Sequence, residues 1–381
     1  MRASGDAPVP RGSDGVAWRP IPALLARPRV VVARILRGLL PKPIVSLRDY
    51  ERLAESRLLP GVWAYISAGA ADELTSRRNE TAFEEICLRP CSLLDISKLD
   101  TRVTLFRRVM PHPILLAPTA NHRLVHPLGE QETARGAGAS ETTLIVSALA
   151  SRSLEAIAAE ATWPLWFQSY LLKDREQTKE MVRRAEALGF EALCITVDQP
   201  VQGMRDRWRK FRRTGNRDSL QNYPVNLVEY PVTWGDIEWY RSLTNLPVVI
   251  KGIMNSDEAE LAIRAGAAAV FVSNHGGRNL DTAPATIQVL PRIADTVAGR
   301  VPVLFDGGIR RGTDLLKALA LGATAVAIGR PYLHGLAVKG AAGVAGVVNI
   351  LRNELEMAMA LTGRTCLARL DRSVVLDRSG Q

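Results

Sequence analysis

A short apolar run with the composition of a β-strand recurs eight times along this 381-residue chain, and a segment with helical periodicity follows it. Polar residues, glycine or proline bound each run, which favours strands over buried helix segments. The runs are Ile114–Pro118, Leu144–Ser147, Leu165–Gln168, Leu193–Val197, Pro247–Ile250, Ala269–Ser273, Pro302–Asp306 and Ala325–Gly329. Eight such units predict a (β/α)8 barrel, with a doubly wound parallel sheet as the alternative.

The segments between the runs carry signals of helix termination. The clearest examples are Asp174–Leu188 before Gly189, Asp257–Ala265 before Gly266, and Thr313–Leu321 before Gly322. Glycine suits the position after a helix because it adopts left-handed backbone angles without steric cost. The pattern therefore predicts helices that alternate with the strands.

Polar residues gather where the runs end. They are Thr119, Ser147, Gln168, Tyr170, Thr196, Asp198, Lys251, His275, Arg278, Asp306, Arg310 and Arg330. In barrels of this kind the chemistry takes place on the loops that follow the carboxyl ends of the strands. A chain without an active site would scatter such residues over both ends, so we interpret this end as catalytic.

The stretch Ser273–Asp281 places two useful side chains three residues apart on a glycine-containing turn. The imidazole of His275 suits a base that works near neutral pH, and the planar fork of Arg278 matches a carboxylate. The carboxylate of Asp198 can stabilise the imidazolium that forms. The alternative is a structural histidine with Asp198 as a helix cap; the co-occurrence of Lys251 and Arg278 favours the catalytic interpretation.

Two later turns predict a phosphate site. Asp306–Gly312 and Ile328–Pro331 follow the seventh and eighth runs, where barrels commonly bind phosphate through backbone N–H groups and a helix N-terminus. Their glycines allow close approach of the backbone, and Arg310 and Arg330 can neutralise charge.

Six ordered segments together resemble the FMN-dependent 2-hydroxy-acid oxidases and dehydrogenases. They are Trp166–Tyr170, Thr196–Asp198, Lys251–Gly252, Ser273–Asp281, Asp306–Asp314 and Gly329–Pro331, and the resemblance runs from about Ser46 to about Arg364. That family includes glycolate oxidase, lactate oxidase, flavocytochrome lactate dehydrogenase and mandelate dehydrogenase, and its fold is the (β/α)8 barrel. The resemblance implies FMN as the cofactor and an L-2-hydroxy acid as the substrate.

The resemblance also implies a catalytic set. His275 would take the proton of the substrate hydroxyl while the α-hydrogen passes to flavin N5, with Asp198 as its orienting partner. Two arginines would lie by the substrate carboxylate, and two tyrosine hydroxyls would hold the substrate carboxylate and hydroxyl. The full set is His275, Asp198, Tyr170, Tyr65, Arg278 and Arg205.

A second set would hold the cofactor. Lys251 resembles the lysine beside flavin N1 and the C2 carbonyl, where a fixed cation stabilises negative charge on the ring. The other cofactor residues are Pro118, Thr119, Ala120, Ser147, Gln168, Thr196, Ser273, Asp306, Gly307, Gly308, Arg310, Gly329 and Arg330. The sequence predicts no metal site, and the pair Cys87 and Cys91 lacks histidine partners.

Departures from the family pattern leave other substrates open. Leu149 stands where plant glycolate oxidases carry tryptophan, so glycolate specificity is not indicated. The segment Arg205–Arg217 replaces the family continuation, and the loop before Thr233 is shortened. A family enzyme that acts on a peptide- or carrier-bound substrate is therefore an alternative, and an FMN-dependent isomerase is a weaker one.

The resemblance and the composition divide the chain into four parts. Residues 1–45 form a basic, Pro/Arg-rich extension, and residues 46–110 form a helical segment that contributes to the active site. Residues 111–345 form the FMN-binding barrel, and residues 346–381 form a C-terminal helix and tail. Family members are commonly tetramers, and oxygen, a quinone or a cytochrome is compatible as electron acceptor.

The net charge of +10 is concentrated in Met1–Ser46 and Arg205–Arg217, each of net charge +6. The rest is nearly neutral, which argues against nucleic-acid binding. Ile21–Pro43 has the pattern of an interfacial amphipathic helix and is too charged to span a bilayer. We expect a cytoplasmic enzyme with peripheral contact to the inner face of a membrane; a disordered start, a transit peptide or a misplaced start codon are alternatives.

Overall fold

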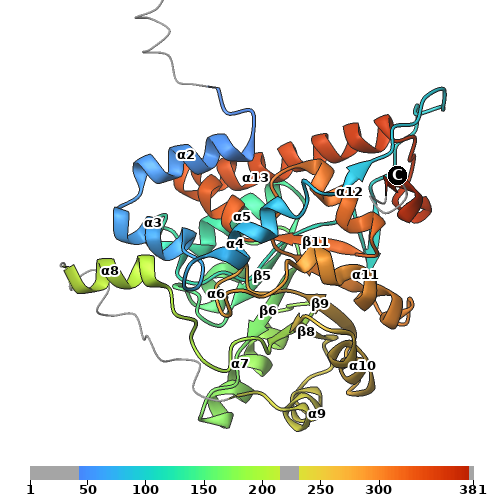
Figure 1. The fold of residues 1–381 in the computed structure, drawn as a ribbon. Helices are drawn as coiled ribbons and strands as arrows, with labels where there is room; N and C mark the ends of the chain where they lie inside the picture. Colours follow the sequence, from blue (N-terminus) through green and yellow to red (C-terminus); the bar gives the residue numbers. More distant parts are fainter. Residues whose placement is uncertain (1–42, 215–230, 377–381) are drawn as a thin grey trace, which may run out of the picture. The chain divides into compact units, whose positions relative to one another are not determined.

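Eight parallel strands close into a barrel in the computed structural model, which describes residues 43–214 and 231–376 (Figure 1). The strands are β4 (Ile114–Leu116), β5 (Thr143–Ser147), β6 (Leu165–Ser169), β7 (Leu193–Thr196), β8 (Val248–Ile253), β9 (Ala269–Val272), β10 (Val303–Asp306) and β11 (Ala325–Ile328). Their order is β10-β11-β4-β5-β6-β7-β8-β9, and β11 pairs with β4 to close the ring. The predicted barrel is therefore confirmed, and the doubly wound alternative is wrong.

The barrel interior is a continuous apolar cluster. It includes Cys194, Phe271 and Leu304, which come from neighbouring or nearby strands. A hairpin of β2 (Val103–Leu105) and β3 (Arg108–Met110) precedes β4 and adds Leu105 and Met110 to this cluster at the end where the strands begin. Burial raises the pKa of the Cys194 thiol to about 12, so this cysteine is a core residue.

Helices cover the outside of the barrel, which explains why both faces of the strands are buried. These are α5 (Glu130–Ala139), α6 (Leu154–Ala158), α7 (Arg175–Ala187), α9 (Trp234–Leu243), α10 (Ser256–Arg264), α11 (Thr286–Val297), α12 (Gly312–Ala320) and α13 (Arg330–Leu361). The three helices expected from sequence are α7, α10 and α12. The glycines after them have φ of +81°, +80° and +113°, in keeping with their expected role as helix ends.

Helix α13 is the one helix in the described part of the chain that is long and apolar enough to cross a membrane. It is interrupted by non-helical backbone at Lys339 and Gly340. It packs against α2 (Leu47–Arg57), α5 and α12, and most of its apolar stretch is buried. Such burial is typical of a core helix, so the length and apolar composition of α13 are weak evidence for a membrane span.

The segment before the barrel contains α2, α3 (Pro60–Ser67) and α4 (Leu74–Thr81). Ser46 and Asp49 form a capping box at the start of α2, and Pro60 occupies the first position of α3. Helix α8 (Asp206–Thr214), which the sequence patterns did not predict, contacts α3. The contact places a piece of the loop after β7 against the N-terminal segment.

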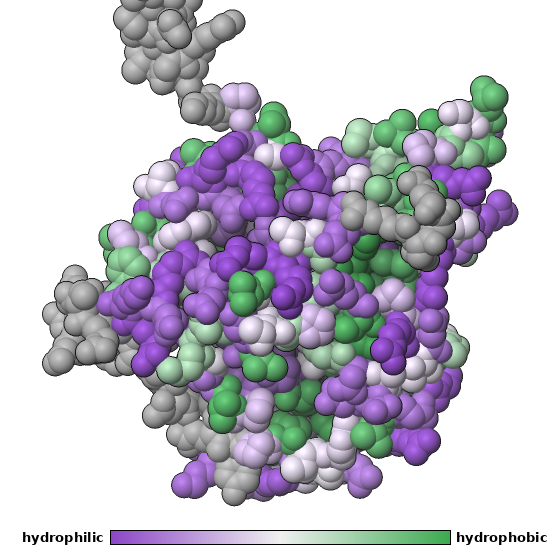
Figure 2. All heavy atoms as spheres, viewed as in Figure 1, coloured by the Kyte–Doolittle hydropathy of each residue, from purple (hydrophilic) through white to green (hydrophobic). Residues whose placement is uncertain are grey.

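A small sheet ties the C-terminal part of the chain to the segment before the barrel. Strand β1 (Cys87–Leu88) pairs with β12 (Val375–Leu376), and the short 3-10 helices are η1 (His122–Leu124), η3 (Leu367–Arg369) and η4 (Arg372–Val374). Between β1 and β2 a projecting loop exposes three apolar side chains, Leu93, Leu94 and Ile96, and Figure 2 shows hydrophobic residues gathered on this projection. Such a group is unusual on an isolated surface.

Two groups of expectations from the sequence are not tested by the structure and stay predictions. The interfacial helix at Ile21–Pro43 and most of the N-terminal extension lie outside the described residues, as does the shortened loop at 215–230. The four-part division of the chain also stays a prediction, and its boundary at residue 345 falls inside α13.

Candidate active site

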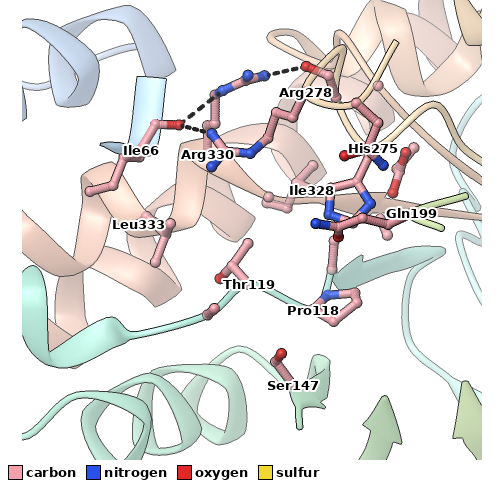
Figure 3. Close-up of a pocket in the computed structure, with 18 of the residues that line it drawn as sticks. Ile66, Pro118, Thr119, Ser147, Gln199, His275, Arg278, Ile328, Arg330 and Leu333 are labelled. Carbon is pink, nitrogen blue, oxygen red and sulfur yellow. Dashed lines mark hydrogen bonds between the residues drawn. The ribbon is translucent and has the colours of Figure 1, made fainter. Parts of the chain in front are cut away.

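A cavity of about 540 Å³ opens where the barrel strands end. Its walls come from the loops after most of the strands and from α3 and α8, and Figure 3 shows His275, Arg278 and Arg330 across from Thr119 and Ser147. Functional pockets that hold cofactors or substrates commonly have volumes of roughly 300–1,000 Å³. The cavity is thus large enough for a cofactor and a small substrate.

Most residues predicted from sequence line this cavity. They are Tyr65, Pro118, Thr119, Ala120, Ser147, Tyr170, Arg205, Lys251, His275, Arg278, Asp306, Gly307, Gly308, Arg310, Gly329 and Arg330. The structure therefore brings together side chains that lie as far apart in the sequence as Tyr65 and Arg330. Their proposed roles stay predictions.

Four predicted residues lie behind the cavity wall. Gln168 Oε1 accepts a hydrogen bond from the Ser147 hydroxyl at 3.0 Å, and Ser273 Oγ accepts one from Lys251 Nζ at 2.8 Å. Asp198 contacts His275, and Thr196 is buried beside Lys251 in the neighbouring strand. These residues support the lining rather than form it.

His275 Nδ1 and Asp198 Oδ1 lie 3.0 Å apart. Burial would raise the pKa of Asp198, but the charges of His275 and Lys251 outweigh it, and this pKa lies below its ordinary value. Asn279 Nδ2 donates to the Asp198 carbonyl oxygen at 2.8 Å and fixes the loop that carries the carboxylate. Asp198 is therefore a charged partner that faces the imidazole.

The backbone of the His275 turn is left-handed. His275 has φ of +56°, followed by Gly276 at +64° and Gly277 at +70°. A side chain on Gly277 would collide with the backbone of Ser76 in α4. A residue other than glycine is uncommon in this region, and such strain is often found at functional sites. The turn aims His275 into the cavity and explains the glycines that follow it.

Lys251 is a buried cation. Its Nζ lies 3.4 Å from Asp306 Oδ2 as well as near Ser273. Burial would lower the pKa of Lys251, but the charges of Asp306 and Asp198 raise it above the ordinary value, so the amine stays protonated. Gly252 has φ of +119° and leaves no room for a Cβ beside Asp198. The positive φ and the lack of space beside Asp198 explain why glycine follows Lys251 in the sequence.

The cations at the mouth of the cavity gather around Tyr65. The guanidinium carbons of Arg205 and Arg278 lie 5.8 Å and 5.6 Å from its ring centroid. Arg278 Nη1 donates to the carbonyl oxygens of Ile66 at 2.9 Å and Ala68 at 3.0 Å. Burial, then the charges of Arg205 and Arg330, lower the pKa of Arg278. Buried positive charge held mainly by carbonyl groups favours an anionic ligand.

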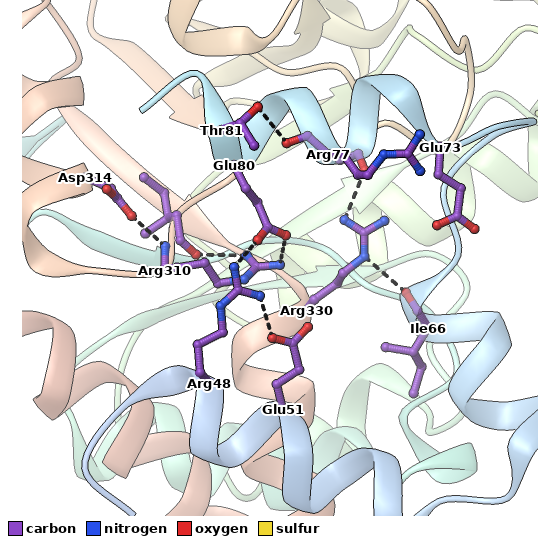
Figure 4. Close-up of polar contacts among 12 residues, drawn as sticks. Arg48, Glu51, Ile66, Glu73, Arg77, Glu80, Thr81, Arg310, Asp314 and Arg330 are labelled. Atoms are coloured by element: carbon purple, nitrogen blue, oxygen red, sulfur yellow. Dashed lines mark hydrogen bonds and ion pairs between the residues drawn. The ribbon is translucent and has the colours of Figure 1, made fainter. Parts of the chain in front are cut away.

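The two glycine turns predicted to bind phosphate also border the cavity. Gly307 and Gly308 have φ of +108° and +84°, and a Cβ at Gly308 would collide with the Asn79 carbonyl. Arg310 Nη2 pairs with Glu80 Oε1 at 2.7 Å, and Arg48 joins Glu80 to Glu51 (Figure 4). The sequence patterns had not indicated that acidic residues share this arginine.

Arg330 is also held by protein groups. Its guanidinium donates to the carbonyl oxygens of Ile66, Ala68 and Gly276. Burial and the charge of Arg310 lower the pKa of Arg330 to about 10. The arginine thus ties the end of α3 to the His275 turn as well as lining the predicted phosphate end.

The residues present fit FMN. Among the described residues, the buried polar atoms in or behind the wall that have no hydrogen-bond partner include Gln168 Nε2, Asp306 Oδ1 and Arg310 Nε. Buried donors and acceptors are normally satisfied, so these atoms await a polar ligand. Lys251 adds a cation beside the ring site, and the glycine turns leave backbone exposed for a phosphate.

The sequence patterns missed several cavity residues, among them Gln199, Asn121 and Trp208. Gln199 Oε1 accepts the hydroxyl hydrogen of Tyr170 at 3.0 Å, and Asn121 Nδ2 donates to the Tyr65 hydroxyl at 3.2 Å. Trp208 packs its ring 5.5 Å from that of Tyr65. Asn121 directly follows Ala120 and Gln199 directly follows Asp198, so their positions beside predicted site residues could have revealed them. No such signal pointed to Trp208.

Comparisons with known proteins show the family to which the chain is related. Residues 54–377 match the model of a family described as FMN-dependent dehydrogenase. The chain is 43% identical over 350 residues to a peroxisomal (S)-2-hydroxy-acid oxidase of Oryza sativa subsp. japonica, covering 87% of this chain and 96% of that protein. It is 42% identical to a 2-hydroxyacid oxidase of Dictyostelium discoideum, covering 88% and 91%.

Solved structures agree as well. Mandelate oxidase with (S)-2-phenylpropionate matches at a TM-score of 0.81 and 39% identity, covering 88% of this chain and 98% of that one. A double mutant of flavocytochrome b2 with pyruvate bound matches at 0.83 and 36%, covering 91% and 90%.

Proposed function

This chain belongs to the FMN-dependent dehydrogenase family, and we propose how its residues carry out the FMN-dependent oxidation of an L-2-hydroxy acid to the 2-oxo acid. The enzyme is an oxidoreductase of CH–OH groups. FMN, when bound, supplies the acceptor for the α-hydrogen and for the two electrons that leave the substrate. The finer points, which concern the residues, the substrate, the acceptor and the surroundings of the enzyme, are argued below.

His275 takes the proton of the substrate hydroxyl. Its Nδ1 faces Asp198, so Nε2 is the nitrogen that can accept the proton, and the carboxylate stabilises the imidazolium that forms. In the structure the hydroxyl of Tyr170 donates to Gln199 Oε1 at 3.0 Å. Because the one hydrogen of the substrate hydroxyl goes to His275, we assign Tyr170 to the substrate hydroxyl as a donor to its oxygen when the acid is bound. Burial, then the charge of Asp198, raise the pKa of Tyr170, so it acts as a neutral phenol.

Arg278, Arg205 and Tyr65 hold the substrate carboxylate. The two guanidinium groups flank one ring at the cavity mouth, where burial makes a carboxylate a favourable partner. This arrangement fixes the acid so that its hydroxyl faces His275. Lys251 lies deeper, and we assign it, with Ser147, Gln168, Thr196, Ser273 and the phosphate-end residues, to holding FMN.

The observation that carries the proposal is the 3.0 Å His275–Asp198 pair in one cavity with Arg278 and Lys251. The test uses the purified yellow holoenzyme without oxygen, to which single L-2-hydroxy acids are added, with their D-enantiomers as controls. Loss of the oxidised-flavin absorbance with L-acids alone is the expected result. Flavin that stays oxidised with every small acid would overturn the proposal.

The alternative substrates are not favoured. The relatives that match over most of the chain are named for free 2-hydroxy acids, including mandelate oxidase. A peptide- or carrier-bound substrate, or an isomerase reaction without net oxidation, has no comparable support. Because Leu149, Leu124 and Val201 line the cavity, we propose an acid with an apolar side chain of more than one carbon.

The electron acceptor is oxygen, a quinone or a cytochrome. A relative named as an oxidase supports oxygen as the acceptor, and the relative named flavocytochrome b2 supports a cytochrome. The test follows reoxidation of the substrate-reduced enzyme by each acceptor in turn. The acceptor that reoxidises it fastest at cellular concentrations identifies the enzyme as an oxidase or a dehydrogenase.

We further propose a cytoplasmic homotetramer with peripheral membrane contact. The exposed Leu93, Leu94 and Ile96 support association, and sedimentation of a Leu93→Asp/Leu94→Asp variant tests it. The four cysteines are all free, which suits a reducing compartment. The charge of Met1–Ser46 supports membrane contact, and flotation with anionic liposomes at low salt tests it.

A further inference from the structure

The residue before α8 and the first turn of α8 present two side chains, Arg205 and Trp208, to the cavity. Arg205 and Trp208 are three positions apart and so lie on one side of a helix. Both line the cavity, and the guanidinium carbon of Arg205 is 5.1 Å from the Trp208 ring centroid and 5.8 Å from that of Tyr65. The cation therefore lies close to two aromatic rings, which also contact each other.

Arg207 lies between them in sequence but does not line the cavity. Its Nε and Nη2 donate to the two carboxylate oxygens of Glu73, each at 3.0 Å, and its Nη1 donates to Ser67 Oγ at 2.9 Å. Ser67 ends α3 and Glu73 precedes α4, so the pair joins α8 to the segment that carries Tyr65. Figure 1 shows α8 beside α3. A two-pronged arginine–carboxylate pair fixes orientation as well as distance.

The backbone of Glu73 is an independent sign that its carboxylate matters. Glu73 has φ of +61°, in the left-handed region that favours glycine. It occupies the cap position of α4 but makes no side-chain cap hydrogen bond there. The side chain of this strained residue instead reaches Arg207. Strain of this kind persists where the surrounding contacts hold it.

The chain that enters α8 is fixed by other contacts. Ala71 N donates to the Met204 carbonyl oxygen at 2.6 Å. Gly203 packs so closely on the backbone of Arg278 and Asn279 that a Cβ would collide with it. Trp208 packs against Ala64 and Ala68, and the pairing of Arg207 with Glu73 adds a polar restraint on the rotation of α8.

We propose that Arg207 is a positioning residue for substrate binding. Its pairing with Glu73 and Ser67 sets the rotation of α8 so that Arg205 and Trp208 face Tyr65, and this sets the affinity for the carboxylate of the acid. Arg207 acts through Arg205 and touches neither the substrate nor FMN. The inference rests on the proposed function for the identity of the ligand.

The test measures the Kd of pyruvate, a simple 2-oxo acid, from the change in flavin absorbance of the holoenzyme, together with KM and kcat. Arg207→Ala and Glu73→Gln should raise Kd and KM about three- to tenfold, since a partly exposed two-pronged pair is of moderate strength. The limiting rate should change little, because His275 and Asp198 do not depend on α8. The matched control is Arg209→Ala, which removes the exposed pair with Asp206 on the same helix and should leave Kd unchanged.

Two further variants separate positioning from folding. Glu73→Gly removes the carboxylate and relieves the left-handed backbone, so pyruvate should bind more weakly while Tm does not fall. The double variant Glu73→Arg/Arg207→Glu should recover most of the lost affinity. Hydrogen exchange of the amides in Arg205–Phe211 should be faster in Arg207→Ala than in the wild type.

Each result has a definite meaning. Glu73→Gly that binds pyruvate as the wild type does, or a charge swap no better than the single variants, would overturn the positioning role. A wild-type enzyme that binds pyruvate through this pair but is reduced by no 2-hydroxy acid would overturn the proposed function alone. A wild-type enzyme that binds neither pyruvate nor a 2-oxo acid with a longer side chain would overturn both.

Discussion

Asp198 holds its carboxylate 3.0 Å from Nδ1 of His275, in a cavity wall where that carboxylate stays charged. This contact fixes the orientation of the imidazole, and the proposed role of His275 as the base rests on it. His275→Ala should keep the flavin and lose reduction by the substrate by roughly 10²–10⁴-fold, the usual contribution of a general base. Asp198→Asn should lose less. Rapid mixing without oxygen measures both rates.

The control for this pair is His126→Ala, which removes a histidine that does not line the cavity. It should be reduced at the wild-type rate. If His275→Ala were reduced as fast as His126→Ala, the base would have to be another residue. Flavin content must be equal in the variants compared, because loss of the cofactor would mimic loss of the base.

Lys251 and Asp306 form the second buried pair that can be tested. Lys251→Met leaves the Asp306 carboxylate buried without its cation, which typically costs about 3–5 kcal/mol of folding free energy. The variant should unfold at lower denaturant concentration and retain less FMN. Lys251→Met/Asp306→Asn should regain much of the stability but not the rate of flavin reduction. Denaturant unfolding and anaerobic reduction of the same preparations check this.

A single variant as stable as the wild type would contradict this account. It would mean that Asp306 finds another partner or takes up a proton. A double variant with wild-type reduction would show that the cation has no catalytic part and that Lys251 serves folding only.

The barrel was predictable from sequence because its strands are buried on both faces. Burial makes each strand an apolar run, and the loops at both ends supply polar residues and glycine that mark its limits. The residues at or just after the carboxyl ends, such as Ser147 and His275, were predictable for the same reason, whereas Lys251 lies inside β8, which continues beyond the predicted Ile250 to Ile253. One topological rule sends all eight strand ends to the same side.

What escaped prediction depends on contacts between distant segments. Glu80 pairs with Arg310 across 230 residues, and no local pattern signals such a pair. Helix α8 has a strongly charged sequence, and its amphipathic pattern does not identify the segment that it packs against, so its contact with α3 and the placement of Trp208 could not be read from it. Gln199 could have been found, since it follows Asp198 directly.

His334 gives a prediction for the pH dependence of stability. Its ring packs 5.3 Å from that of Trp63, and Nε2 has no hydrogen-bond partner among the described residues. Burial lowers the pKa of His334 to about 3 in the fold, against about 6.5 in the unfolded chain. Its contribution is therefore fully present above pH 6.5 and is lost as the pH falls toward 3, because the unfolded chain takes up the proton first.

The variant His334→Phe keeps a ring against Trp63 and removes the titrating group. Between pH 7 and pH 5 it should lose roughly 2 kcal/mol less unfolding free energy than the wild type, at about 1.4 kcal/mol per pH unit below 6.5. Other buried histidines, such as His112, titrate in both proteins and cancel in the comparison. Parallel stability curves from denaturant unfolding at both pH values would show that His334 is protonated equally in the two states.

Leu149 controls the width of the cavity beside Ser147. Its backbone is fixed, because Leu149 N donates to Ser147 Oγ at 3.1 Å and its carbonyl oxygen accepts from Asn121 N at 3.2 Å, so side-chain size decides the space. Leu149→Trp should lower kcat/KM for acids with long or aromatic side chains about 5- to 150-fold relative to acids with a methyl side chain, the range expected for an overpacked pocket. The matched control is Leu280→Trp at an exposed position outside the cavity, which should leave kcat/KM unchanged for short and for long acids. Equal losses for short and long acids would mean that the side chain of the substrate lies elsewhere.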